Sequence, residues 1–431
     1  MKKRNALRPL AVLISALTIL IALTCLSSCG LLTTADLGIA EITDTVVNEN
    51  GELVVYYSNG TQRVVGMVES NSTNVVIEGD GESVAGATAK GLMSAVSIQS
   101  NFTSRTQSYI PGFGIIGGSG NSYYSRGSGV IYRIEGDEAL IITNHHVVHD
   151  SGSNTSDGIS NDILVCLYGR EETQYAMSAE YVGGSQYYDI AVLRVKDSAL
   201  SGATVAAVTV AEGDVAVGQT AIAIGNPQGY GISASLGIVS VDSEYIYLED
   251  TFTTRVIRVD TAVNAGNSGG GLYNGHGELI GIVNAKIVDE SVENIGYAIP
   301  TSVAIAVADN IIDNCLGKSA RSVKRAALGI NLDAASSYTR LNEDGMLEIV
   351  ESVVVTTAEY GTLAYGSLER GDILVSIAIG SDVCEITRTH HLIDFMLKAR
   401  VGDTVEVTVI RGGETLVKSF KITSSDVSSY R

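Results

Sequence analysis

The sequence predicts a mostly β protein that contains a pair of β-barrels. Between about residues 86 and 320, short runs rich in Val, Ile and Thr alternate with turn-forming Gly, Asn and Ser, a pattern typical of antiparallel barrels. A chain of 431 residues is too long for one ordinary domain, so we expect two folded units with appendages. Hydrophobic residues make up 45% of the chain, which suffices for two cores and argues against disorder.

The most apolar of these runs are the clearest strand candidates. Residues 301–316 carry apolar side chains at helical spacing, so we expect a helix that closes the first unit. We place this unit at residues 85–322 and a smaller second domain at residues 323–425, after a basic polar joint. The predicted strands include Gly129–Tyr132, Ala139–Thr143, Ile190–Val195, Thr220–Ile224 and Leu279–Val283.

The first 28 residues have the pattern of an export signal. A basic start is followed by an apolar run from Leu10 to Leu23. The run leads to Leu-Ser-Ser-Cys at residues 26–29, which resembles the bacterial lipobox, so we expect a lipid on Cys29 that tethers the protein outside the cytoplasm. The alternative is an uncleaved membrane anchor, although the apolar run is short for a spanning helix.

Residues 29–84 are predicted to hold the lipidated cysteine, a small β-hairpin module and a linker. Polar and apolar side chains alternate over residues 40–68, and two Asn-Gly dipeptides interrupt the pattern at turns. A hairpin alone is marginally stable, so we expect it to pack on another part or to act as a spacer. The linker is predicted at residues 70–84.

Charge and cysteine content exclude several classes of protein. The net charge is −20, and it becomes −24 without residues 1–28, which hold four basic and no acidic residues. Such a surface repels phosphate backbones and argues against a nucleic-acid partner. Beyond Cys25 and Cys29, three scattered cysteines remain, with no Cys-x-x-Cys pair. We therefore expect no metal motif, no redox motif and no disulfide framework. The scattered cysteines are Cys166, Cys315 and Cys384.

A glycine-rich segment at residues 266–271, Gly-Asn-Ser-Gly-Gly-Gly, is suited to hold a nucleophilic serine. Glycines on both sides of Ser268 permit a tight turn that exposes its hydroxyl. We expect an oxyanion hole at Gly266, Asn267 and Ser268, through the converging N–H groups of Gly266 and Ser268. Taken alone, the segment also fits a structural glycine-rich loop, of which the chain has others.

Two further segments offer a base and a carboxylate. The apolar run at residues 140–143 leads to the adjacent His145 and His146, either of which could serve as the base at a strand end. Asp189 precedes the apolar run at residues 190–193, where an unpaired buried charge is costly and a histidine N–H would satisfy it. Taken singly, each also fits a structural role, as a packed histidine or a solvated aspartate.

Together and in this order, the three segments resemble the Deg/HtrA family of trypsin-like serine proteases. Thr-Asn-His-His-Val at residues 143–147 matches the family's Thr-Asn-x-His-Val, which assigns the base to His146. Asp-Ile-Ala-Val-Leu at residues 189–193 and Gly-Asn-Ser-Gly-Gly at residues 266–270 match the carboxylate and nucleophile segments. The order His, Asp, Ser is that of chymotrypsin.

The resemblance implies a catalytic triad of Ser268, His146 and Asp189 on a chymotrypsin-like double six-stranded β-barrel. It also implies that Asn284, Ala285 and Lys286 line the primary specificity pocket. The family usually has Pro where Gly271 stands, a departure that loosens the strand without touching the catalytic groups. Four more segments resemble the family, at residues 128–131, 224–227, 237–240 and 296–300.

Residues 323–425 resemble the PDZ domain of this family, an α+β fold. Leu328, Gly329 and Ile330 stand where the family's loop captures a peptide carboxylate while the peptide adds a strand. Residues 359–368 replace the usual Pro-rich stretch, so the peptide specificity does not transfer. The alternative is a small β-rich packing domain.

The resemblance implies an ATP-independent serine endopeptidase of the cell envelope that cleaves unfolded or damaged exported proteins. The chain contains no Gly-x-x-x-x-Gly-Lys-Ser/Thr loop for nucleotides, and without metal motifs we expect no cofactor. The resemblance also implies a homotrimer. The alternative is a non-catalytic envelope adaptor or chaperone, which the intact set of triad residues disfavours.

Overall fold

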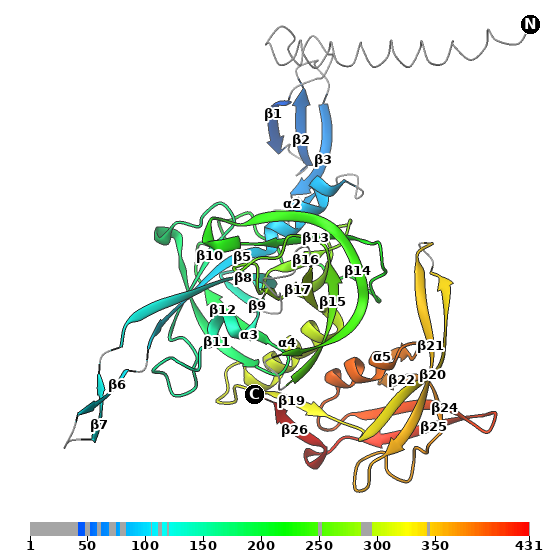
Figure 1. Ribbon diagram of the computed structural model, residues 1–431. Coiled ribbons are helices and arrows are strands. Elements are labelled where there is room, and N and C mark those ends of the chain that lie inside the picture. Colours follow the sequence, from blue (N-terminus) through cyan, green and yellow to red (C-terminus); the bar gives the residue numbers. More distant parts are fainter. Residues whose placement is uncertain are drawn as a thin grey trace, which may run out of the picture. The chain divides into compact units, whose positions relative to one another are not determined.

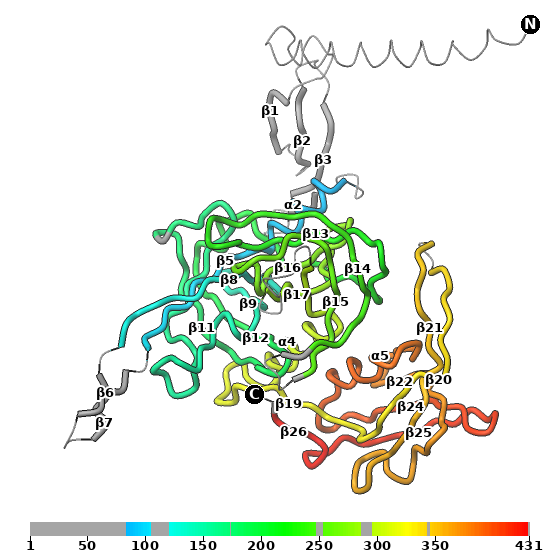
Figure 2. The backbone as a smooth tube through the Cα atoms, in the orientation of Figure 1, coloured from blue at the N-terminus to red at the C-terminus, as the bar shows by residue number. Residues whose placement is uncertain are grey.

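The structure is a computed structural model and divides into two compact units, residues 1–79 and residues 80–431. The predicted export signal and Cys29 lie outside the residues that it describes. No helix among the described residues is long and apolar enough to cross a membrane. The described residues are 42–47, 52–57, 62–68, 75–77, 83–104, 106–110, 114–118, 120–248, 252–285, 295–342 and 345–430 (Figures 1 and 2).

The first unit holds a four-stranded antiparallel sheet whose strands are neighbours in chain order. Three strands fall in the region predicted as a hairpin module. The fourth falls at Val75–Ile77, inside the segment predicted as a linker, because this short β-branched run pairs with the strand before it. The strands are β1 (Ile42–Val47), β2 (Glu52–Tyr57), β3 (Gln62–Val68) and β4 (Val75–Ile77).

The second unit begins with helix α2 (Val84–Ser94), which Ser83 caps by accepting a hydrogen bond from the backbone N–H of Gly86. A closed six-stranded barrel follows, with its strands in the order β10-β11-β12-β9-β8-β5. Its strands are β5 (Ala95–Thr103), β8 (Ser122–Glu135), β9 (Glu138–Thr143), β10 (Asp162–Leu167), β11 (Met177–Ser185) and β12 (Ile190–Lys196).

A second closed six-stranded barrel, in the order β13-β14-β15-β18-β17-β16, completes the mostly β architecture that the sequence predicts. Helix α4 (Thr301–Cys315) follows its last strand directly, where the helical spacing predicted it. The barrel strands are β13 (Thr220–Gly225), β14 (Ser233–Leu248), β15 (Phe252–Val259), β16 (Gly271–Tyr273), β17 (Leu279–Val283) and β18 (Gly296–Pro300).

Both barrels have tightly buried cores because their strands place β-branched side chains inward. In the first barrel, Ile131 and Leu193 are completely buried, as are Ile257 and Leu272 in the second. Between β5 and β8, the ribbon of β6 (Thr106–Ile110) and β7 (Gly114–Gly118) forms a separate two-stranded sheet. The double barrel confirms the predicted fold of the first large domain.

The C-terminal part is a PDZ-like domain with its own core. Its sheet runs β20-β21-β22-β24-β25, with β23 paired to β22, and β20 lies at one edge. Helix α5 (Thr389–Phe395) packs against this part (Figure 1). The strands are β20 (Ile330–Leu341), β21 (Leu347–Ala358), β22 (Ile373–Ile379), β23 (Asp382–Glu385), β24 (Thr404–Arg411) and β25 (Glu414–Lys421), and β19 (Val323–Ala326) pairs with β26 (Val427–Tyr430).

Buried contacts join the PDZ-like domain to the double barrel. Leu397, just after α5, is buried in the same apolar cluster as Ile311 of α4. The guanidinium of Arg255, on β15, donates to the carboxylate of Asp394 at the end of α5, and their side chains are only 4% and 9% exposed. Breaking a buried ion pair by removing one partner is costly, so this pair anchors α5 to the second barrel.

Candidate active site

Strand pairing brings His146 and Asp189 together. Thr143, at the end of β9, pairs with Ala191 near the start of β12. His146 lies on the short helix α3 (His145–Val148) that follows β9, and Asp189 directly precedes β12. The imidazole Nδ1 of His146 lies 2.7 Å from Asp189 Oδ2, and the backbone N–H of His146 donates to Asp189 Oδ1 at 2.9 Å. One carboxylate therefore holds both the ring and the backbone of the histidine.

Two asparagines hold Asp189 in place. Its backbone has φ +49°, a left-handed conformation in which aspartate is one of the better tolerated residues. The side-chain amide of Asn144 donates to the Asp189 carbonyl at 2.8 Å. The amide of Asn284, a fully buried residue that follows β17, donates to Asp189 Oδ2 at 2.7 Å. These contacts orient the carboxylate toward His146.

The environment keeps Asp189 ionised. The residue is only 5% exposed, and burial alone would raise the pKa of its carboxyl group. The charge of His146 and the hydrogen bonds from that residue outweigh burial and lower the pKa of Asp189 below its usual range. A carboxylate that stays charged at neutral pH can hold the His146 Nδ1–H and stabilise an imidazolium.

The neighbouring His145 occupies a different position. His145 is buried, and the centroid of its ring lies 4.7 Å from that of His149 and 6.4 Å from that of Tyr181. The structure thus separates the two adjacent histidines, which the strand pattern alone could not: His146 contacts Asp189 through its ring, and His145 packs among aromatic rings.

The loop that carries Ser268 requires glycine at two positions. Gly266 has φ +98° and Gly269 has φ +84°. A Cβ atom on Gly266 would lie 2.3 Å from the Asn226 carbonyl oxygen, and one on Gly269 would lie 2.2 Å from the Ser128 carbonyl oxygen. Other side chains would therefore meet both an unfavourable backbone conformation and a clash with backbone atoms.

Ser128, on β8 of the first barrel, anchors this loop of the second barrel. Its hydroxyl donates to the Gly266 carbonyl at 2.7 Å and accepts the Asn226 N–H at 2.8 Å. Its backbone N–H donates to the Ser268 carbonyl at 2.8 Å. The nucleophile loop is thus fastened across the boundary between the barrels.

The polar groups around Ser268 are arranged for acyl chemistry. The residue is 4% exposed, and its Oγ accepts the Ala285 N–H at 3.1 Å. The Asn267 N–H donates to the Asn264 carbonyl at 3.0 Å. Among the described residues, the N–H groups of Gly266 and Ser268 donate to no acceptor, which leaves two of the three expected oxyanion-hole groups available.

The segment after β17 contributes more than the sequence indicated. Asn284 and Ala285, expected as pocket walls, make polar contacts to Asp189 and Ser268 respectively, while Lys286 lies outside the described residues. Asn284 and Asp189 are 95 positions apart. No spacing signal links residues so distant, so sequence reasoning missed the supporting roles of Asn144 and Asn284.

The predicted carboxylate-binding loop lies at the start of the edge strand β20. Leu328 is buried, and Gly329 has φ +74°. The carbonyls of Leu328 and Gly329 accept the N–H groups of Ala364 and Glu359 at 3.0 and 2.9 Å. A Cβ on Gly329 would lie 2.2 Å from that of Thr362, so this turn also depends on glycine.

Comparison with known proteins places this site in a family. A model described as a trypsin-like peptidase domain matches residues 127–282. The Serine protease Do-like HtrA of Lactococcus lactis subsp. cremoris (strain MG1363) is 31% identical over 318 residues, which cover 70% of this chain and 71% of that protein. The chain belongs to the HtrA family of serine proteases. This confirms the resemblance seen in its motifs.

The chain covers less than two thirds of the length of some other HtrA relatives. The Serine protease Do-like HtrA of Bacillus subtilis (strain 168) is 32% identical over 304 residues, which cover 69% of this chain but 63% of that protein. The chain spans 54% of a probable periplasmic serine endoprotease, DegP-like, of Pseudomonas putida, at 32% identity over 67% of its own length. A solved HtrA-type protease, AlgW with decapeptide, gives a TM-score of 0.49 at 26% identity and covers 81% of this chain and 99% of that chain.

Replacing Asn284 tests its support of Asp189. The Asn284→Ala variant loses a hydrogen bond to a charged group, worth about 1.5–3 kcal/mol. We expect kcat on a peptide substrate to fall about 10- to 150-fold, with KM little changed. Asn314→Ala, on α4, removes a partly buried amide away from the site and serves as the control. Wild-type kcat in the Asn284→Ala enzyme would contradict the assignment.

Proposed function

We propose that this HtrA-family chain is a serine endopeptidase with Ser268 as nucleophile, His146 as general base and Asp189 as orienter. The observation that carries the proposal is the pair of contacts between His146 and Asp189. The ring nitrogen Nδ1 of His146 lies 2.7 Å from Asp189 Oδ2, and the backbone N–H of His146 donates to Asp189 Oδ1. Nδ1–H donation to Asp189 selects the tautomer whose Nε2 is free to take a proton. Ser268 lies on a loop of the second barrel, and Ser128 of the first barrel holds that loop by donating its backbone N–H to the Ser268 carbonyl.

The reaction follows from these positions. Ser268 Oγ attacks the scissile carbonyl as His146 takes its proton, and His146 then protonates the leaving amine. The N–H groups of Gly266 and Ser268 stabilise the tetrahedral oxyanion, since no described acceptor engages them. Because the Asn267 N–H is bonded to Asn264, the proposal gives Asn267 the role of shaping the turn. A water molecule then attacks the acyl-enzyme with His146 as the base, and the acyl group leaves Ser268.

The proposed substrates are unfolded or damaged exported proteins, cleaved without ATP. The names of relatives support an envelope location, since one is a probable periplasmic endoprotease. The non-catalytic adaptor is not favoured, because the described site keeps a complete set of catalytic side chains. Tethering through Cys29 and assembly into a homotrimer remain part of the proposal.

We propose that the PDZ-like domain binds peptide C-termini. The edge strand β20 pairs only with β21 among the described strands, so a peptide can add to its free edge by main-chain hydrogen bonds. Leu328, Gly329 and Ile330 form the turn that enters β20 and would receive the terminal carboxylate. Helix α5 would flank the added strand.

Ser268→Ala tests the nucleophile. Removing the attacking oxygen should abolish fluorophosphonate labelling and lower kcat on unfolded casein by about 10⁶-fold, as expected when the nucleophile of a triad is removed. Gel-based labelling and casein cleavage measure both effects. Ser233→Ala, which changes an exposed serine on β14, should leave both unchanged. Labelling that persists in Ser268→Ala would refute the assignment. A folded wild-type chain that neither labels nor cleaves would favour the adaptor.

Peptide binding tests the turn before β20. We expect fluorescein-labelled peptides with a free, apolar C-terminus to bind the Ser268→Ala chain in fluorescence anisotropy, and their C-terminal amides to bind at least about tenfold more weakly, because a charged hydrogen bond is lost. Gly329→Ala should weaken binding, since its Cβ collides with Thr362. Gly413→Ala, in an open turn at positive φ, controls for backbone strain. Equal affinity for acid and amide would exclude carboxylate capture.

Cys29→Ser tests the tether. The wild-type chain expressed in a bacterium should enter the detergent phase on Triton X-114 partitioning, and intact mass spectrometry should show a lipid on an N-terminal Cys29. The variant should stay in the aqueous phase unless its apolar segment remains uncleaved. A wild-type chain that retains residues 1–28 and carries no lipid would support the uncleaved membrane anchor instead.

A further inference from the structure

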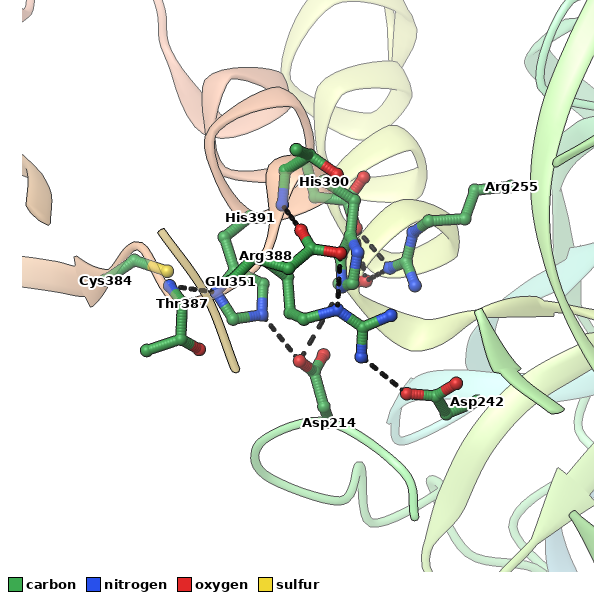
Figure 3. Close-up of polar contacts among 12 residues, drawn as sticks. Asp214, Asp242, Arg255, Glu351, Cys384, Thr387, Arg388, His390 and His391 are labelled. Carbon is green, nitrogen blue, oxygen red and sulfur yellow. Dashed lines mark hydrogen bonds and ion pairs between the residues drawn. The ribbon is translucent and has the colours of Figure 1, made fainter. Parts of the chain in front are cut away.

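Three side chains of the types that bind metal ions meet where α5 contacts the second barrel (Figure 3). Asp214 lies in the loop before β13, and His390 and His391 lie in the first turn of α5. One ligand atom from each residue lies within 4.8 Å of the other two. Asp214 Oδ2 is 2.5 Å from His391 Nε2 and 3.6 Å from His390 Nε2. The catalytic residues contribute nothing to this cluster.

His390 points a buried, unsatisfied nitrogen into the cluster. The residue is 3% exposed, and within the part of the chain that the structure describes its Nε2 has no hydrogen-bond partner. The nearest acidic oxygen, on Asp214, is too distant for a normal hydrogen bond. A buried polar atom without a partner is costly, and a neutral imidazole can offer the lone pair of Nε2 to a cation.

His391 can present the tautomer that a metal requires. Its Nδ1 lies 3.0 Å from the Glu385 carbonyl oxygen, and donation from Nδ1–H to a backbone carbonyl is the usual support of a metal-bound histidine. That tautomer leaves the Nε2 lone pair directed at Asp214. The Thr387 N–H also lies 3.2 Å from Nδ1. This second arrangement places the proton on Nε2, where it bonds Asp214 when no ion is bound.

The two arginines beside the cluster are paired with carboxylates. The guanidinium of Arg388 contacts Asp242 at 2.6 Å and Glu351 at 3.6 Å, and that of Arg255 contacts Asp394. These pairs neutralise the nearby cations. Among the described residues, the carboxylate of Asp214 pairs with imidazoles and with no guanidinium or ammonium group. Its carboxylate is therefore available to a cation.

We propose that Asp214, His390 and His391 bind one divalent transition-metal ion, with zinc as the best-fitting ion. Two imidazole nitrogens and one carboxylate oxygen form a typical zinc set, with a fourth position for water. Bonds of about 2.0–2.2 Å in a tetrahedron separate donor atoms by about 3.4 Å. The separations from Asp214, 2.5 and 3.6 Å, lie within about 1 Å of that value, so small side-chain movements complete the site.

The surrounding structure brings the ligands together without the ion. The buried pair of Arg255 and Asp394 holds the end of α5 on β15, and Ser302 of α4 donates to the same carboxylate at 2.8 Å. The ion would then join the loop before β13 to α5. It would stabilise the contact between the double barrel and the PDZ-like domain, since an ion that binds only the folded state stabilises that state.

Zinc binding to the full chain tests the site independently of proteolysis. The chain carries Ser268→Ala to prevent self-cleavage and is stripped of metal with EDTA. Isothermal titration calorimetry with Zn²⁺ should show one ion per chain, and Co²⁺ should give the visible absorption bands of a four-coordinate ion. Asp214→Asn and His391→Ala should each weaken Zn²⁺ binding at least about tenfold, because each removes one of three protein ligands.

Matched controls identify the site. Asp214, His391 and Asp382 line one cavity, and Asp382 is an exposed carboxylate that pairs with Lys398. Asp382→Asn should therefore leave Zn²⁺ affinity unchanged. Asp214 and His391 are partly exposed, so their variants are expected to fold, which circular dichroism checks. If calorimetry detects no Zn²⁺ binding when ion and chain are present at equal concentrations, the proposal is overturned. Binding that both ligand variants leave intact would also overturn it, because the ion would then lie elsewhere.

Discussion

The arrangement of the candidate active site depends on one buried carboxylate, that of Asp189. Burial alone would favour its neutral form, and its charge is kept because donors surround it. The ring and backbone of His146 and the amide of Asn284 supply those donors. Asn144 holds the left-handed backbone that aims the carboxylate. The alignment of β9 with β12 places His146, Asn144 and Asp189 at one end of the first barrel, where a ladder of backbone hydrogen bonds holds them, and Asn284 reaches them from the second barrel.

The second constraint is that Ser268, the proposed nucleophile, belongs to the other barrel. Ser128 fastens the loop that carries Ser268 from the first barrel, so the two barrels must be packed together for this anchoring to form. In return, the segment after β17 reaches back, with Asn284 on Asp189 and Ala285 on Ser268. These reciprocal contacts couple folding of both barrels to assembly of the site. A glycine at position 269 is required because Ser128 approaches so closely.

Contacts of another kind position the PDZ-like domain on the second barrel. Its contacts with the second barrel include the ion pairs of Arg255 and Arg388 with carboxylates, and Leu397 supplies an apolar contact with the cluster around α4. Buried ion pairs add little net stability but penalise any misplacement of one partner. They therefore specify where α5 sits. This arrangement leaves His390 buried with an unsatisfied nitrogen, which a bound cation would satisfy.

The sequence by itself determined several of the barrel strands, the helix after the second barrel, and the order of the histidine, aspartate and serine segments. These features are local: alternation, helical spacing and glycine-rich turns are written in neighbouring residues. The motif match had already assigned the base to His146, whereas only the tertiary structure placed its ring on Asp189 and recruited Asn144 and Asn284. The tertiary structure also joined Asp214 to His391, which lie 177 positions apart. Such contacts arise from strand register and domain packing, and no local pattern records which distant side chains these bring together.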